Sequence, residues 1–252
     1  MKNLDLSTLP AKKRKQIVSC LRAGIQLLYF LFLPSVFTAA FNGVKYIFTQ
    51  IGQGEKIEMT AFVSALLLVC AFTIVFGRFF CGFACAFGSL GDAMHAIYGI
   101  ICKKRKKKPR CIKPELAKKL VLIKYGILLL IALCCFAGVY QKARGTSPWD
   151  VFSMLHAGNF RLSSYIPGIV LLVLILVGMF FEERFFCRFL CPMGAVFSLL
   201  PILPFFTLHR KRENCIRGCS ACTRQCPSAV ELPSNGSVEI SGDCFQCQKC
   251  ID

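Results

Sequence analysis

Four long apolar segments constrain this chain more than any other feature. They are residues Ile17–Phe41, Met59–Gly77, Leu120–Tyr140 and Ile166–Phe181. A helix needs about 20 largely apolar residues to cross the hydrocarbon core of a bilayer, and these segments approach or exceed that length. The hydrophobic fraction of 55% also exceeds the roughly 45–50% of soluble domains. The sequence therefore predicts an all-α membrane protein with four transmembrane helices, and excludes a disordered chain or a plain cytosolic enzyme.

Positive charge is distributed unevenly among the connections between these segments. Of the 31 lysines and arginines, 24 lie in residues 1–16, in residues 78–119 and after Glu182, whereas five lie in residues 42–58 and 140–165. Lysine and arginine accumulate on the cytoplasmic side of membrane proteins. We therefore expect a multi-pass protein of the cell membrane with both termini in the cytoplasm.

Contact with lipid accounts for the longest basic run and for the two basic residues inside predicted spans. The run from Lys103 to Lys108 lies between two predicted spans, where topology and contact with anionic headgroups account for it. Basic runs also occur in nucleic-acid-binding tails. The position of this run between two predicted spans favours membrane lipid as its partner, and we expect no binding to nucleic acid. Arg22 and Lys124 lie near the starts of two spans, and we expect their long side chains to extend to the membrane interface.

An internal repeat relates the two halves of the chain. Residues 78–88 and 184–194 are identical at seven of eleven positions, and the offset of 106 residues also carries the first predicted span onto the third and the second onto the fourth. Each unit consists of an outgoing helix, an outer loop, an ingoing helix and a cysteine motif. Because both units start on the same side, we expect a parallel two-helix tandem repeat with its pseudo-twofold axis along the membrane normal.

The repeated motifs carry two cysteines each in the spacing C-x3-C. These are Cys81, Cys85, Cys187 and Cys191. Residues i and i+4 share one helix face, so two motifs that face each other across the axis would form a four-thiol site at the membrane edge. Thiolates bind iron–sulfur clusters and zinc, and Arg78 and Arg184, one turn before each motif, would offset the negative charge. Pro192 and the small residues after Cys85 could each start a new helix. Packed free cysteines and a redox disulfide within each motif stay open as alternatives.

The last forty residues contain seven further cysteines and no long apolar run. They are Cys215, Cys219, Cys222, Cys226, Cys244, Cys247 and Cys250. Bacterial ferredoxins use the run C-x2-C-x2-C-x3-C-P, in which the fourth cysteine ligates the other of two clusters. Pro227 follows Cys226 in the same way. We predict a small ferredoxin-like domain with two [4Fe–4S] clusters. Zinc ribbons use similar spacings, and disulfides are disfavoured in a reducing cytoplasm.

This tail departs from the ferredoxin pattern in two places. The first gap has three residues instead of two, which alters the loop but not the number of ligands. Cys226 and the last three cysteines would complete one cluster, whereas Cys215, Cys219 and Cys222 supply only three ligands for the other. Either the polypeptide continues past Asp252, or this cluster has three irons or a foreign fourth ligand. We favour the first explanation.

Duplicated C-x3-C motifs after apolar helices, followed by a two-cluster ferredoxin segment, resemble the membrane-bound polyferredoxins. This family includes the NapH-type quinol-oxidising subunits and the C-terminal half of NosR-type proteins. Cys187-x3-Cys191-Pro192 matches the family motif fully, whereas Cys85 is followed by Ala86. The resemblance implies electron transfer between a membrane or extracytoplasmic partner and cytoplasmic clusters. It also implies an FMN-carrying flavoprotein partner, since the chain shows no flavin-binding domain.

These observations predict five segments and one leading function. The segments are a basic N-terminus (1–16), the first membrane repeat (17–102), a basic linker (103–119), the second membrane repeat (120–208) and the iron–sulfur tail (209–252). We expect electrons to pass between the tail clusters, which exchange with a cytoplasmic donor or acceptor, and the four-cysteine centre, then onward to a quinone or flavoprotein.

No nucleophile–base pair or dinucleotide fingerprint is evident, so an electron-transfer subunit is favoured over a stand-alone enzyme. The main alternative is an accessory or regulatory iron–sulfur protein that matures another metalloenzyme. A transporter would also use parallel repeats, but the spans have almost no ionisable residues to line a pathway.

Overall fold

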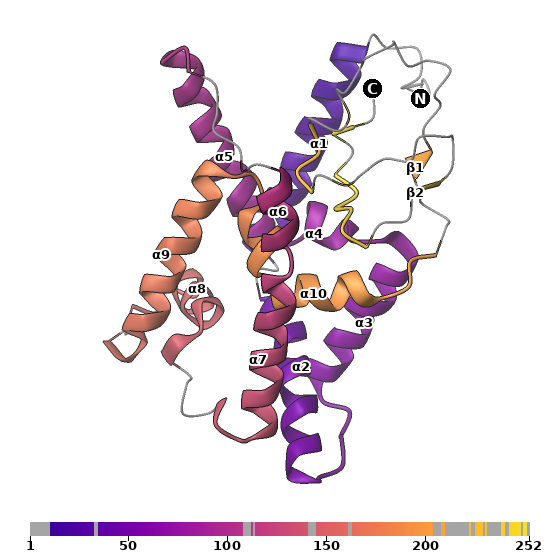
Figure 1. The fold of residues 1–252 in the computed structure, drawn as a ribbon, viewed down its shortest axis with the longest axis vertical. Coiled ribbons are helices and arrows are strands. Elements are labelled where there is room, and N and C mark those ends of the chain that lie inside the picture. Colours follow the sequence, from indigo (N-terminus) through magenta and orange to yellow (C-terminus); the bar gives the residue numbers. More distant parts are fainter. Residues whose placement is uncertain are drawn as a thin grey trace.

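The computed structural model shows a mostly helical protein (Figure 1). It describes residues 11–32, 35–107, 112, 114–140, 145–160, 163–203 and 208–209, and the tail residues 222, 225–228, 230, 238–239, 242–247 and 249–250. The prediction of a helical fold is confirmed. Within these ranges the strands are β1 (Leu208–His209) and β2 (Val238–Glu239), which pair antiparallel and join the start of the tail to its later part.

The helices follow one another in the same order in both halves. The first half contains α1 (Ala11–Phe32), α2 (Val36–Gln53), α3 (Ala61–Phe76), α4 (Phe79–Phe83) and α5 (Ala86–Lys104). The second half contains α6 (Pro114–Leu120), α7 (Ile123–Phe136), α8 (Pro148–His156), the 3-10 turn η3 (Ser163–Tyr165), α9 (Ile166–Phe181), the π-helix η4 (Phe186–Leu190) and α10 (Pro192–Leu199). Adding 106 to the bounds of α3 or α4 gives those of α9 or η4 to within one residue, and α10 starts where α5 plus 106 starts.

One helical stretch in the described part of the chain is long and apolar enough to cross a membrane by itself. It is Glu115–Phe136, in which α6 leads into α7. The helices α3 and α9 are apolar but have only 16 residues each, which corresponds to about 24 Å at a rise of ~1.5 Å per residue. Four complete crossings therefore stay a prediction.

The first predicted span is not one helix. Residues Ile17–Phe41 divide between α1, which ends at Phe32, and α2, which begins at Val36. The two helices are long and apolar enough to cross a membrane only when taken together, and they form a pair bent by 62°. The sequence places Pro34 between them. Proline lacks an amide hydrogen and clashes with the preceding turn, so it interrupts a helix whatever the hydropathy of its neighbours.

The segment predicted as the second outer loop, 140–165, contains the helix α8. This helix has Pro148 at its first turn, and the Ser147 side chain accepts a hydrogen bond from the Asp150 amide at 3.4 Å. Serine before a first-turn proline is a strong helix start. The apolar face of α8 packs on α9 and α2, which brings this loop into the core.

Aromatic side chains join the two halves in the core. Phe87 of α5 lies with its ring centre 4.5 Å from that of Phe152 and 5.0 Å from that of Phe186. Trp149 contacts Phe41 at 5.2 Å between ring centres. All five rings are buried. Because these residues come from both units, burying them drives the halves together.

Helix α2 approaches α3 closely at Gly43. A Cβ atom at this position would lie 2.5 Å from the Phe62 carbonyl oxygen and 3.0 Å from the Leu66 side chain. We expect Gly43→Ala to force the two helices apart and to destabilise the fold by about 1–3 kcal/mol, measured as a lower melting temperature in detergent by circular dichroism. Gly24→Ala on α1 is the matched control, because no atom lies within 4 Å of its added Cβ. An unchanged melting temperature for Gly43→Ala would contradict the close α2–α3 packing.

Candidate metal centre

Each C-x3-C motif lies where one short helix ends and another begins. Cys81 belongs to α4 and Cys187 to η4, whereas Cys85 and Cys191 are the N-cap residues of α5 and α10, with extended backbones at ψ 121° and 113°. The expectation that both cysteines of a motif share one helix face is therefore wrong. The predicted new helices after Cys85 and at Pro192 are confirmed. The Cys191 sulfur accepts a hydrogen bond from the Gly194 amide at 3.2 Å, as an anion-favouring helix N-terminus allows.

The four thiols of the two motifs lie close together, although the two cysteines of each motif belong to different helices. All four cysteines are buried, with at most 5% of their surface exposed. A side-chain hydrogen bond with Cys85, together with burial, raises the pKa of Cys187 well above its ordinary value. Burial raises the pKa of Cys81 and Cys191, and each of these thiols also interacts electrostatically with Cys187. Among the described residues, no three His, Cys, Asp or Glu side chains are arranged to hold a single metal ion.

Two arginines at equivalent positions cross between the halves. Arg184 donates to the carbonyl oxygen of Cys81, and Arg78 donates to that of Cys187 at 3.4 Å. Each arginine thus binds the first cysteine of the other motif. Glycines provide the space, because a Cβ at Gly88 would lie 2.9 Å from Arg184 Nη1 and one at Gly194 would lie 2.8 Å from Arg78 Nη2.

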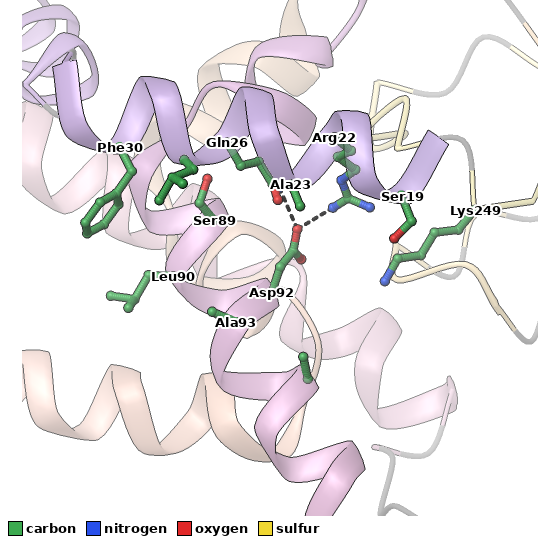
Figure 2. A pocket seen from close by; sticks show the side chains of 12 residues that line it. Ser19, Arg22, Ala23, Gln26, Phe30, Ser89, Leu90, Asp92, Ala93 and Lys249 are labelled. Carbon is green, nitrogen blue, oxygen red and sulfur yellow. Dashed lines mark hydrogen bonds and ion pairs between the residues drawn. The ribbon is translucent and has the colours of Figure 1, made fainter. Parts of the chain in front are cut away.

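Asp92 on α5 anchors the first of two charge clusters that contain buried cations (Figure 2). It accepts hydrogen bonds from Arg184 Nε at 2.9 Å and Gln26 Nε2 at 2.8 Å, and it also pairs with Arg22. Burial opposes its ionisation, but the Arg184 guanidinium and then Arg22 hold the pKa of Asp92 at about 2. Arg22 therefore pairs with a carboxylate inside the protein. The expectation that it extends to the membrane interface is wrong.

Asp243 of the tail anchors the second cluster. It accepts hydrogen bonds from Ser198 at 2.9 Å, Arg78 at 3.2 Å and Lys124. The Lys124 side chain is 1% exposed, so its expected extension to the interface is wrong as well. Asp92 and Asp243 together face four formal cations, since Arg22 and Arg184 share one carboxylate, and Arg78 and Lys124 share the other.

The site therefore buries more positive than negative charge beside four thiols. Isolated buried charge is costly unless an opposite charge compensates it. Four thiolates around an iron–sulfur core carry net negative charge, and their donor set is the one such clusters use. In addition, Arg78 Nε is buried without a hydrogen-bond partner among the described residues. On donor chemistry, charge balance and this free donor, the residues fit a thiolate-ligated cluster.

The described cysteines of the tail form a second group. The Cys244 thiol interacts electrostatically with Cys247, Cys226 and Cys250, and Cys250 interacts with Cys222 as well. Burial raises the pKa of Cys244 and of Cys250 to about 11, so metal binding here would displace protons. The structure thus brings together the four cysteines predicted to share one cluster.

The ligand set of the other predicted tail cluster is only partly visible. Cys222 is described, whereas Cys215 and Cys219 lie outside the described residues.

Phe245 joins the tail to both repeated motifs. Its ring is 2% exposed, and its centre lies 4.8 Å from the guanidinium carbon of Arg78 and 5.4 Å from that of Arg184. The Phe245 carbonyl oxygen packs against Gly82, where no Cβ would fit. Sequence reasoning missed Phe245, Asp92 and Asp243, since no motif marks them. The signal that could have pointed to the two carboxylates was the presence of Arg22 and Lys124 in apolar segments, because a buried cation needs a compensating charge.

A cavity of about 520 Å³ lies beside the Asp92 cluster, between α1 and α5 (Figure 2). Its wall is mostly apolar, with Leu27, Phe30 and Leu90, and it has polar groups from Arg22 and Lys249. The cavity therefore combines an apolar wall with hydrogen-bond donors. Asp92 in its lining accepts a hydrogen bond from Arg184, which donates to the carbonyl oxygen of Cys81.

Comparisons with known proteins agree with this geometry. A family model described as a 4Fe-4S binding domain matches residues 59–109 and 166–208, which contain both C-x3-C motifs. An uncharacterized protein of Methanocaldococcus jannaschii is 30% identical over 77% of this chain and 68% of its own. No solved structure matches the chain.

Two relatives have informative names. The putative electron transport protein YccM of Escherichia coli is 25% identical over 75% of this chain and 53% of its own length. The ferredoxin-type protein NapH of Haemophilus influenzae is 25% identical over 75% of this chain and 64% of its own. The chain thus spans about half to two thirds of these relatives.

The helical scaffold with duplicated cysteine motifs defines a membrane-associated iron–sulfur protein. The chain belongs to the membrane-bound 4Fe–4S polyferredoxin family, and the family resemblance drawn from the sequence is confirmed. Membership of this family supports a general role in iron–sulfur electron transfer.

Removing the Asp92 carboxylate leaves Arg22 and Arg184 buried without their shared anion. We expect Asp92→Asn to lower the free energy of unfolding by about 3–5 kcal/mol, as for other broken buried ion pairs. Because the pKa of Asp92 is lowered from 3.8 to about 2, this stabilisation is complete above pH 3.8 and is lost as the pH falls through 2. Thermal unfolding at neutral pH measures the loss, with Asp150→Asn as control. Equal stability of the two variants would contradict the cluster.

Proposed function

We propose that this protein relays electrons between a cytoplasmic redox partner and a membrane-side partner through two cysteine-bound centres. The observation that carries the proposal is that Arg184, which lies over the Phe245 ring, interacts electrostatically with one cysteine of each group, Cys187 of the second motif and Cys247 of the tail. Cys81, Cys85, Cys187 and Cys191 would hold one centre, and Cys226, Cys244, Cys247 and Cys250 a [4Fe–4S] cluster. Cys215, Cys219 and Cys222 would contribute to a second tail cluster. Such clusters supply one-electron chemistry.

The residues around the thiols prepare the site for negative charge in a region with little water. Arg78 and Arg184 stay charged, because guanidinium groups do not deprotonate in proteins. Their hydrogen bonds to carbonyls of the opposite motif fix the halves relative to each other. Fixed cations of this kind stabilise electron-rich states and raise the reduction potential of an adjacent centre.

We further propose four membrane crossings in a parallel repeat, with both termini in the cytoplasm. The equivalent order of helices in the two halves supports the repeat. Exposed leucines on α7 and α9, such as Leu129, Leu130 and Leu174, support contact with lipid. The bias of lysine and arginine supports the orientation.

A quinone or a flavoprotein would be the membrane-side partner. The cavity between α1 and α5 supports a quinone, because its apolar wall suits an isoprenoid-bearing ring and its donors suit quinone oxygens. Asp92 at its edge connects through Arg184 to the carbonyl of Cys81. The cavity thus reaches the surroundings of the four-thiol site.

The central test is Cys187→Ala. Anaerobically purified wild-type protein should contain iron and sulfide in excess of one tail cluster and show EPR signals of reduced clusters. The variant should lose the iron of one centre and its signal while keeping the tail signals, because the tail ligands are untouched. Cys70→Ala is the matched control, since this cysteine lies in α3 outside both motifs. A spectrum and iron content unchanged by Cys187→Ala would remove the four-cysteine centre, and wild-type protein without reducible iron would defeat the relay.

The quinone site is tested by filling the cavity. We expect Ala93→Phe, whose new ring would occupy the space beside Asp92, to slow the oxidation of dithionite-reduced protein by duroquinone severalfold while iron content stays constant. Gly99→Ala on the same helix is the control, because no atom lies near its added Cβ. Equal oxidation rates for the wild type and Ala93→Phe would reject this cavity as the quinone site.

A further inference from the structure

The two halves differ at one buried position that matters for charge. The offset of 106 residues carries Asp92 on α5 onto Ser198 on α10. Asp92 pairs with Arg184, the arginine of the opposite motif. Ser198 accepts from Arg78, the equivalent arginine, at 3.4 Å, but a serine carries no charge. The second half therefore lacks the carboxylate that the first half has built in.

The tail provides that carboxylate. Asp243 bonds Ser198, Arg78 and Lys124 at the same place. Lys124 lies on α7 one helical turn before the position equivalent to Arg22, so each half contributes one further cation beside its arginine. Both sites thus hold two cations and one carboxylate, but in the second site the carboxylate comes from outside the repeat.

We propose that residues 242–247 are a docking segment that completes the second half of the membrane scaffold, with Asp243 as a substitute for the missing counterpart of Asp92. In this role Asp243 is a positioning residue. It fixes the tail cysteines on either side of Phe245 against the C-x3-C motifs. The tail is then an integral part of the scaffold and not a tethered ferredoxin domain. The value of this position for electron transfer rests on the proposed function, but the docking itself does not.

The fit of the segment is specific at the level of the backbone. A Cβ at Gly242 would lie 2.6 Å from the Ser198 carbonyl oxygen, and a Cβ at Gly82 would collide with the Phe245 carbonyl oxygen. Chain segments that approach this closely leave no room for a shifted register. Between these two contacts, the Phe245 ring lies near both arginines, and outside them Lys249 pairs with Glu183 near η4.

Docking has a consequence for the charge of the site. Without the tail, Arg78 and Lys124 would be buried beside a serine hydroxyl and the Cys187 carbonyl, with no carboxylate among their described partners. Two such cations repel each other at low dielectric constant. The same contact that positions the tail cysteines therefore also stabilises the site formed by the membrane helices.

The test separates scaffold stability from docking. Asp243→Ala should lower the melting temperature, because two buried cations lose their anion. Ser198→Asp should reverse that loss in the double variant, since Ser198 Oγ lies 2.8 Å from Lys124 Nζ and 3.4 Å from Arg78 Nη1. The tail would still lack its anchor. Amide hydrogen exchange in a peptide covering residues 242–247 should then be at least about tenfold faster than in the wild type.

Three results would overturn the proposal. The first is wild-type exchange in the double variant, which would show that Asp243 does not hold the tail. The second is a double variant as unstable as Asp243→Ala, which would show that Asp243 does not stand in for a carboxylate of the scaffold. The third is an effect of equal size for Glu55→Ala, an exposed control acid on the loop after α2. Hydrogen exchange and melting are read without reference to iron, so absent iron would defeat the proposed function while leaving this comparison intact.

Discussion

Buried positive charge organises this structure. Arg78 and Arg184 are each 1% exposed, and a guanidinium cannot escape its charge by losing a proton. Each therefore needs fixed acceptors, and each finds them in the opposite half, at the carbonyl of the first cysteine of the other motif. The two halves cannot separate without exposing these groups or leaving them unpaired. The crossing arginines thus determine where the four thiols lie.

The charges around the thiols form a connected system. Asp92 joins α1, α5 and the arginine before η4, whereas Asp243 joins α7, α10 and the tail. With two carboxylates against four cations, the region favours a negatively charged group, and thiolates bound to iron are such a group. The same buried cations that join the two halves therefore also suit the negatively charged iron–sulfur centre that we propose at the four thiols.

The tail belongs to this system because of Asp243 and Phe245. A ferredoxin-like segment on a flexible linker would sample many distances from the C-x3-C motifs, whereas one held by an ion pair to two buried cations and by a buried ring near two arginines has a fixed position. Electron transfer slows steeply with distance, so the proposed relay would benefit from such fixation. The close approach at Gly82 serves the same end, since a side chain there would hold the tail away.

The sequence by itself predicted a helical fold, a tandem repeat and the grouping of the cysteines. Apolar runs and the offset of 106 residues are local or periodic signals, and cysteine spacing is a direct record of ligand chemistry. It did not reveal the break between α1 and α2 inside Ile17–Phe41, because hydropathy averages over a single proline. Only the tertiary structure decided that the four thiols converge although the two cysteines of each motif lie on different helices, that Arg22 and Lys124 turn inward, and that Asp92 and Asp243 receive them. These outcomes depend on contacts between residues roughly 70 to 165 positions apart, and a buried ion pair leaves no local pattern in the chain.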